Sequence, residues 1–268
     1  MQKLITAKPD SLLNYVSKIW YHRHMIIVLA QRDLKVKYAQ TFVGIAWTLL
    51  QPITAVLIFT LFFHFVLKIN ASYPYSLFVL SGYLIWSIFS YVFNQATPGL
   101  INQSDLVKKI HFPKIIIPIS KVVIALTEFI ISFLLFVIMT LIFKVKLTLA
   151  VILLPLALAP VILFSLGISL LLSALTVKKR DLLHFVPFIV NFSIWFTPVF
   201  YPVNLVPDQY HSLLYINPIT SSIHLFRSIF LGDPYSVYFF IGLTLALIVF
   251  ILGVLTFKSV EEKINDNL

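Results

Sequence analysis

The sequence contains no cysteine, which excludes disulfides and thiolate metal sites. Its seven histidines show no metal-ligand spacing, since His22 and His24 are two residues apart and would point to different sides of a helix. The chain has neither the H-E-x-x-H motif of zinc proteases nor a nucleophile elbow. We therefore expect no catalytic site, no metal and no cofactor bound by this chain.

Glycine is also scarce, with seven residues among 268. The phosphate-binding loop G-x-x-x-x-G-K-[ST] needs glycines that let backbone N–H groups approach the phosphates of ATP. None of the seven stands five residues before a Gly-Lys pair. The chain cannot itself be a P-loop ATPase, so any ATP-driven work has to come from a partner.

Charged residues make up only 11% of the chain, whereas hydrophobic residues make up 60%, and the mean hydropathy is +0.97. A soluble domain has about 25% charged and about 45–50% apolar residues. The composition therefore predicts an all-α membrane protein. The few carboxylates are terminal or scattered singly. This disfavours an enzyme, whose chemistry would need a base or a pair of carboxylates.

Six apolar segments are long enough to cross the ~30 Å hydrocarbon layer as helices of ~20 residues. They form one transmembrane domain, residues 1–268, and cover 42–67, 76–97, 115–143, 147–177, 182–202 and 235–257. Residues 203–232 mix Pro, Asn and Asp with apolar pieces. They are too interrupted for one span and too apolar for a free loop, so we predict short re-entrant half-helices at the outer leaflet.

Lysine and arginine concentrate on one side of this topology. With the N-terminus inside and alternating spans, most of the 20 basic residues lie inside. The exceptions are Lys68, Lys144, Lys146 and Arg227. Because cytoplasmic loops carry an excess of Lys and Arg, both termini are predicted to be cytoplasmic. The same rule accounts for the net charge of +10 without a nucleic-acid partner.

The stretch QRDLKVKYAQTFVGIAWTLLQP at 31–52 sets a charge cluster directly before the first span. Residues 10–41 are predicted to form an interface helix on the cytoplasmic membrane surface. On a 3.6-residue period its apolar face comprises Ile27, Ala30, Leu34, Tyr38 and Thr41. Arg32, Lys35 and Lys37 would attract lipid phosphates. Alternatively, these cations serve only as a topology signal.

Gln51-Pro52 lies inside the first predicted span. Proline in a spanning helix frees a backbone carbonyl, which is tolerated only where neighbouring groups or water satisfy it. We therefore expect the first helix to be deformed and to face protein or a cavity.

Glu128 is the only carboxylate well inside a predicted span, and ionisable groups there are costly and functional by default. One interpretation is a hydrogen bond across a dimer or a polar channel wall. The other is a carboxyl group satisfied by a neighbouring hydroxyl, such as that of Thr127 or one on another helix. A proton relay would need several such groups, which disfavours proton-coupled transport.

His224 and Arg227 lie three residues apart on the predicted outer half-helix. Asp208 and Asp233 are near them in sequence. For these residues we expect snorkelling and salt bridges in the loop.

Aromatic residues recur in two of the predicted spans. In the fifth span, Phe188, Phe192 and Trp195 share one face, which Val199 would continue. The full aromatic set of the two spans comprises Phe59, Phe62, Phe63, Phe188, Phe192, Trp195 and Phe196. Aromatic rings stack well on sugar faces, so these side chains could line a polysaccharide pore. The alternative is ordinary contact with lipid or neighbouring helices.

The stretch RDLKVKYAQTFVGIAWTLLQP resembles the N-terminal signature of permease subunits of type-2 ABC exporters. It is most similar to the branch that exports lipid-linked polysaccharides, namely O-antigen, teichoic acid and some capsules. The resemblance covers essentially the whole chain. It includes LINQSDLVKKIHFPK at 100–114, TVKKRDLLHF at 176–185, FTPVFYP at 196–202 and YINPIT at 215–220.

The resemblance implies that two copies form a membrane channel and that each copy docks a separate ABC ATP-binding subunit, which carries ATP and Mg. Residues 100–113 resemble the coupling helix that enters a cleft of that subunit. The residues implied for this contact are Ser104, Asp105, Leu106, Val107, Lys108 and Lys109. The first and fifth spans resemble pore-lining helices, and residues 203–232 resemble the outer gate.

The resemblance further implies a bacterial plasma (inner) membrane location. The expected cargo is an undecaprenyl-diphosphate-linked polysaccharide, with O-antigen as the best guess. Teichoic acid, capsule or a drug would be other cargoes of the same family. An alternative from another class is a membrane-embedded enzyme that modifies glycolipids. A purely structural scaffold would leave the irregular 201–232 region without a purpose.

Overall fold

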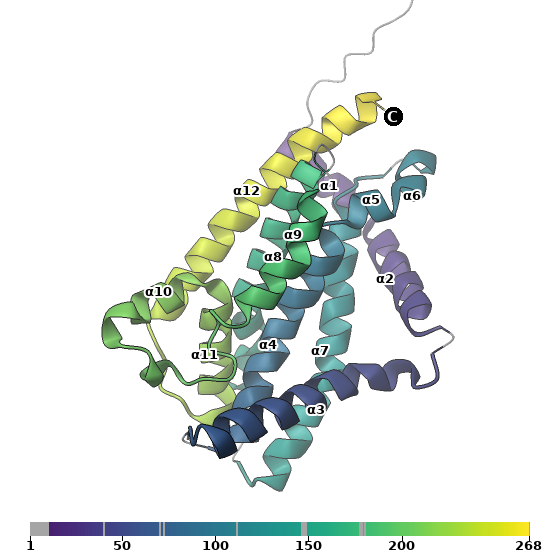
Figure 1. Ribbon diagram of the computed structural model, residues 1–268. Helices are drawn as coiled ribbons and strands as arrows, with labels where there is room; N and C mark the ends of the chain where they lie inside the picture. Colours follow the sequence, from purple (N-terminus) through teal and green to yellow (C-terminus); the bar gives the residue numbers. More distant parts are fainter. Residues whose placement is uncertain are drawn as a thin grey trace, which may run out of the picture.

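The structure is a computed structural model that describes residues 11–39, 41–69, 71, 73–110, 112–145, 149–176, 179 and 181–267. Within these ranges all regular structure is helical and no strand occurs, which confirms the predicted all-α class. The longest helices run side by side in a bundle, which α3 crosses obliquely (Figure 1). Lys146 and residues 10, 147 and 177, where predicted segments begin or end, lie outside the described ranges.

The elements follow one another along the chain with these bounds. First come α1 (Leu12–Tyr21), α2 (Arg23–Tyr38), η1 (Gly44–Ala46), α3 (Trp47–Phe59) and the π-helical η2 (Thr60–Val66). Next come α4 (Tyr75–Ala96), α5 (Gly99–Asn102), α6 (Ser104–Lys109), α7 (Ile116–Ile142), η3 (Leu149–Leu153) and α8 (Leu154–Thr176). The last are α9 (Leu182–Ser193), η4 (Val203–Leu205), η5 (Asp208–Tyr210), α10 (His211–Ile216), α11 (Pro218–Leu231) and α12 (Tyr238–Asn267).

Among the described residues, 5 helical stretches are long and apolar enough to cross a membrane. They are Gly44–Val66, Tyr75–Ala96, Ile116–Ile142, Ala150–Thr176 and Tyr238–Glu261. The fifth predicted span, 182–202, is the one not found at full length, because α9 ends at Ser193 and turns follow. Pro198 and Pro202 account for this, since proline lacks an N–H and disfavours helical backbone in the preceding residue. The predicted count of six spanning helices is thus confirmed for five.

The first span is deformed, as the sequence predicts. Pro52 lies inside α3, and the carbonyl of Thr48, four residues earlier, accepts a hydrogen bond of 3.2 Å from Ser132 Oγ of α7. A neighbouring helix thus satisfies the carbonyl that proline leaves without its N–H partner. Farther along, the helix widens into η2, the π-helical segment.

The predicted interface helix over 10–41 is two helices, α1 and α2, which meet at His22. Ala30 of the predicted apolar face is buried, but Ile27 is exposed and Thr41 lies beyond the end of α2. Because α2 packs against α7, part of this face meets protein rather than lipid.

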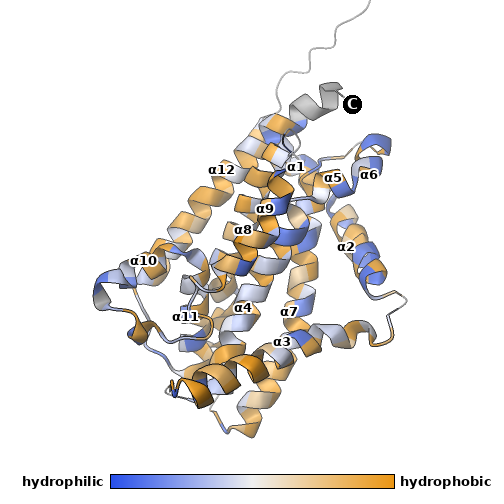
Figure 2. Cartoon of the chain, in the orientation of Figure 1, coloured by the Kyte–Doolittle hydropathy of each residue, from blue (hydrophilic) through white to orange (hydrophobic). Residues whose placement is uncertain are grey.

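The bundle is built around α4, which contacts α3, α7, α8, α9 and α11. α12 runs along α8 and approaches it closely at two glycines. A Cβ on Gly167 would lie 2.6 Å from Phe250 Cα, and a Cβ on Gly253 would collide with the carbonyl of Gly167. Small residues let helix backbones approach each other in lipid, where the hydrophobic effect does not drive helices together. Figure 2 shows mainly hydrophobic residues along the bundle helices, hydrophilic residues in α6 and a mixture of both in α2.

Residues 203–232 contain short helices, as predicted. α11 starts with Pro218, and the Asn217 side chain caps it by accepting a hydrogen bond of 3.0 Å from Ile219 N. Most of α11 is buried among α4, α8 and α12. Its aromatic residues also meet those of α7 in a cluster of Phe133, Phe136, Phe226 and Phe230.

Candidate functional site

Five charged side chains gather between α2 and α7. This α2–α7 charge cluster comprises Arg32, Asp33, Lys37, Lys121 and Glu128. Lys121 forms an ion pair with Asp33 Oδ2, and Arg32 donates to Oδ1 at 2.9 Å from Nε and 2.7 Å from Nη2. Gln103, directly before α6, donates to Asp33 Oδ2 at 3.3 Å. Asp33 therefore connects α2 to α7 and to the segment that carries α6.

Glu128 is the second centre of the cluster. Lys37 forms an ion pair with Oε1, and the Tyr38 hydroxyl donates to the same oxygen at 2.8 Å. The Tyr38 hydroxyl also shares a hydrogen bond of 2.6 Å with Thr48 Oγ1 of α3. A hydroxyl on another helix thus satisfies Glu128, which is one of the interpretations left open above. Thr127 instead bonds the backbone of its own helix.

Two of the three cations predicted to attract lipid phosphates are therefore already paired. Arg32 faces Asp33, and Lys37 faces Glu128. Lys35 is exposed and forms no ion pair with any residue of the described ranges. The sequence identified the cations but not their ion pairs. Arg32 pairs with Asp33 through the local geometry of two side chains on α2, and Lys37 pairs with Glu128 because α7 packs against α2.

The protonation states on α2 follow from this geometry. Partial burial alone would raise the pKa of Asp33, but the hydrogen bonds and charges of Lys121 and Arg32 hold it below its ordinary value. Burial, aided by the charge of Glu128, raises the pKa of the Tyr38 hydroxyl to about 12. Asp33 is thus an anion at neutral pH, and Tyr38 remains a hydrogen-bond donor.

Next to the cluster lies a cavity of about 590 Å³, which we call the polar cavity. All five cluster residues line it, together with Gln51 of α3 and Gln103. Most of its remaining wall is one face of α4, here called the α4 polar stripe, which comprises Tyr83, Trp86, Ser87, Ser90, Tyr91, Asn94 and Gln95. Val36, Asn102 and Ala125 complete the lining. Gln51 thus faces a cavity, as predicted. The stripe was missed in the sequence, although its spacing of three and four residues is visible there.

Three of the seven predicted pore aromatics come together around one ring. Phe59 of α3 stacks on Phe200 with centroids 3.8 Å apart, and Trp195 meets Phe200 edge-on at 5.5 Å. Phe63 lies 5.6 Å from the same ring. Phe200 is fully buried and joins the two aromatic groups, a role that spacing in the sequence could not show.

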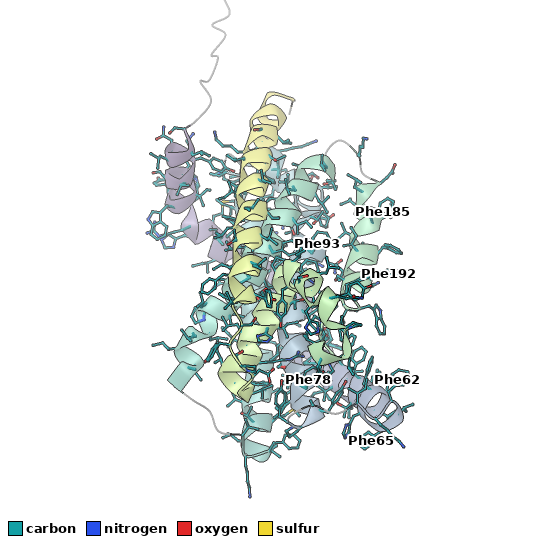
Figure 3. The ribbon with its side chains drawn as sticks, turned by 90° about the vertical axis from the view of Figure 1, so that its left-hand side faces the viewer. Phe62, Phe65, Phe78, Phe93, Phe185 and Phe192 are labelled. Atoms are coloured by element: carbon teal, nitrogen blue, oxygen red, sulfur yellow. The ribbon has the colours of Figure 1, made fainter. Side chains whose placement is uncertain are left out.

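The outer members of this aromatic set are exposed on the molecule. Phe62, Phe188, Phe192, Trp195 and Phe196 are each at least 50% exposed. Figure 3 shows Phe62 and Phe192 on the same side of the molecule. Val199 does not continue this face. It is fully buried, because the helix has already ended at Ser193.

The predicted coupling residues form α6, a six-residue helix that projects at the same end of the molecule as the C-terminus (Figure 1). Leu106 and Val107 are half-buried against the core, whereas Ser104, Asp105, Lys108 and Lys109 are exposed. Asp105 stands in the first turn, and the two lysines stand in the last, where each charge complements the helix dipole. The segment thus presents a charged surface on an apolar base.

Arg227 does not snorkel, so this part of the prediction is wrong, and among the described side chains neither Arg227 nor His224 forms a salt bridge with Asp233. The Arg227 side chain is 4% exposed. Its guanidinium donates to Ser81 Oγ at 3.1 Å and to the carbonyls of Pro198, Val199 and Phe78 at 3.0, 2.9 and 3.1 Å. Arg227 therefore ties α11 to α4 and to the turn after α9. Asp233 instead accepts from the Tyr73 hydroxyl at 3.1 Å, and the side chain of Asp208 lies outside the described residues.

Glu261, one of the carboxylates near the C-terminal end of the sequence, is buried. Its carboxylate accepts from the Tyr15 hydroxyl at 2.5 Å and from Lys114 N at 2.6 Å. It thus links α12 to α1 and to the segment before α7. In the part of the chain that the structure describes, no group of three His, Cys, Asp or Glu side chains could hold a metal.

Comparison with known proteins agrees with this architecture. Residues 24–231 match the family model described as ABC-2 type transporter. One relative is the "O-antigen export system permease protein RfbA" of Myxococcus xanthus, 30% identical over 222 residues, 82% of this chain and 85% of that protein. A Klebsiella pneumoniae protein of the same description is 24% identical over 230 residues, 84% of this chain and 88% of that protein. This chain belongs to the ABC-2 type transporter family.

Proposed function

We propose that this chain is the channel-forming permease subunit of an ATP-driven exporter. Its cargo is an undecaprenyl-diphosphate-linked polysaccharide, best assigned as O-antigen, which moves from the cytoplasm to the outer face of the plasma membrane. The observation that carries this proposal is the similarity to two O-antigen export system permeases, which extends over 82% of the chain for one and 84% for the other. Teichoic acid and capsule are alternative cargoes of the same mechanism.

In this proposal two copies of the chain enclose the channel and two ATP-binding subunits drive it. The end of the bundle that carries α1, α6 and the C-terminus lies in the cytoplasm. α6 enters a cleft of the ATP-binding subunit through Ser104, Asp105, Leu106, Val107, Lys108 and Lys109. Its projection from the bundle and its four exposed polar residues support this role.

The aromatics of α3, η2 and the α9 region contact sugars in the channel. Phe200, which is fully buried, packs against Phe59 and Trp195. Further support is the exposure of Phe62 and Phe192, which Figure 3 shows on the same side of the molecule. A second copy that packs against this side would enclose the aromatics. Among the three predicted cations, Lys35 is the best placed to meet a lipid phosphate, because Arg32 and Lys37 already hold carboxylates.

The test is purification of the chain from its own host, with and without Asp105→Ala plus Leu106→Ala. We expect an ABC ATPase to accompany the unaltered chain in equal amounts and to be lost with the double variant. Gln209→Ala plus Leu213→Ala, at exposed positions near α10, is the matched control and should retain the ATPase. Recovery of the chain alone in every case would contradict the proposal.

The cargo is tested by deleting the gene for the chain. We expect a lipid-linked glycan to accumulate inside the cell while the same glycan disappears from the surface, and its analysis separates O-antigen from teichoic acid and capsule. Unchanged surface glycan without accumulation would exclude polysaccharide export.

A further inference from the structure

The α4 polar stripe is unusual for a membrane-spanning helix. Its members occupy positions i, i+3, i+4, i+7, i+8, i+11 and i+12, so they share one face. At 1.5 Å per residue the stripe is ~18 Å long. Polar groups in a span face protein or a water-filled cavity, and here they face the polar cavity. The stripe contains amides, hydroxyls and aromatic rings but no formal charge.

Much of the hydrogen-bonding capacity around this cavity is unused. The side chains of Gln51, Asn94 and Gln95 form no hydrogen bond with any described residue. Gln103 donates to Asp33, but its Oε1 is buried and has no partner among the described residues. A buried acceptor without a partner is costly. Each amide also offers both donors and acceptors, so the cavity can bind a ligand that carries several hydroxyl groups.

The charges around the cavity favour a neutral ligand over a phosphate. Its three cations, Arg32, Lys37 and Lys121, are all held by Asp33 or Glu128. A phosphate would have to break these pairs and would leave a carboxylate without its cation. A ligand with hydroxyl groups can instead use the amides and leave the pairs in place.

We propose that the polar cavity binds sugar rings of the exported glycan at the cytoplasmic entrance of the channel. This inference rests on the proposed function and assigns it a sugar-binding site. Sugar hydroxyls would bond Asn94, Gln95 and the free acceptor of Gln103. The apolar C–H faces would lie on Tyr83 and Trp86, whose centroids are 5.9 Å apart, because the face of an aromatic ring attracts such partially positive hydrogens. The volume of about 590 Å³ lies within the range of small-molecule sites.

The test is equilibrium binding to the complex of chain and ATPase, purified from its host and placed in nanodiscs. The probe is a tritiated oligosaccharide released from the lipid-linked glycan of the host, with inorganic diphosphate as competitor. Asn94→Leu plus Gln95→Met removes two amides at similar volume. Gln31→Met, at an exposed position of α2 outside the cavity, is the matched control.

We expect saturable binding by the unaltered complex and by Gln31→Met, and about tenfold weaker binding by the double variant, because two amides that bond the sugar hydroxyls are lost. Diphosphate should not compete. Trp86→Leu should also weaken binding, whereas Trp47→Leu, outside the cavity, should not. Equal ATPase recovery for all variants shows that they have folded.

Unchanged binding by the double variant and by Trp86→Leu would overturn the inference, and displacement by diphosphate would show an anion site instead. Failure of the proposed function has a different signature, because gene deletion would then leave surface glycan unchanged. If deletion abolishes export while both cavity variants bind and export normally, only the sugar site is wrong.

Discussion

Asp33 and Glu128 each hold several partners. Those of Asp33 come from α2, α7 and the segment before α6, whereas both partners of Glu128, Lys37 and Tyr38, lie on α2. Breaking one partnership therefore leaves a charge in a partly buried place, and this costs more than the contact itself contributes. Lys37 remains 40% exposed, so water moderates the cost at Glu128. The pair joins α2 to α7, and its effect should be measurable as a coupling energy.

We predict that Lys37→Met lowers the free energy of unfolding by about 1 kcal/mol, because Glu128 keeps its charge but loses its cation. Adding Glu128→Gln should recover part of this loss, since the neutral amide can still accept from Tyr38. Thermal unfolding of the two single variants and the double variant forms a double-mutant cycle. Strictly additive effects would show that the pair contributes nothing.

Asp33 gives a prediction that depends on pH. Its pKa is lowered in the folded state by Lys121 and Arg32, against the effect of burial. The resulting stability is present above the ordinary pKa of 3.8 and is lost as the pH falls through the lowered folded value. Melting curves should thus show unaltered protein more stable than Asp33→Asn at neutral pH, with the difference shrinking in acid. A difference that is constant across the acid range would count against this ion-pair network.

At the scale of elements, hydropathy and proline positions predicted much of the fold. Long apolar runs identified five helices, and Pro52 correctly indicated a carbonyl that needs a partner. Pro198 also indicated that α9 ends early, but the apolar residues continue past the end of the helix, so hydropathy predicted a longer span. Length in a hydropathy profile does not distinguish a helix from a helix followed by buried turns.

The contacts between elements were much less predictable. A 3.6-residue period shows that α2 has an apolar face, but lipid and α7 are equally apolar neighbours for it. Arg227 was expected at the surface because arginine usually reaches water. Two of its actual partners are carbonyls of a turn that exists only because α9 ends early, and the others lie on α4, so no local pattern could identify them.

The contact between α8 and α12 depends on close backbone approach. We predict that Gly253→Val lowers the free energy of unfolding by about 1–3 kcal/mol or more, since the new side chain collides with the carbonyl of Gly167. Thermal unfolding in detergent measures this. Leu252→Val, an exposed neighbour on the same helix, should change little. Equal melting temperatures for both variants would show that this contact tolerates added volume.

At the scale of the whole molecule, charge and aromatic surface occupy different places. The α2–α7 charge cluster and α6 are joined through Gln103, which bonds Asp33 and directly precedes α6. A displacement of α6 by the ATPase would therefore act directly on α2 and α7. The exposed aromatics belong to other elements, η2 and the α9 region, and in the proposed exporter they would meet cargo or a second copy.

Arg32 and Lys37 are engaged in ion pairs within the protein, whereas Lys35 is exposed. A variant of Lys35 can therefore test attraction of lipid phosphates without breaking an ion pair. Reversal of Lys37 would place two carboxylates together at Glu128 and disturb the fold, whereas Lys35→Glu changes only an exposed charge. A polybasic position near anionic headgroups contributes about 1 kcal/mol, so reversal of Lys35 should reduce glycan export several-fold while membrane insertion and ATPase recovery persist. Surface glycan per permease molecule is the measurement, with exposed Lys68→Glu after η2 as the control. Equal export by both variants would show that Lys35 acts only as a topology signal.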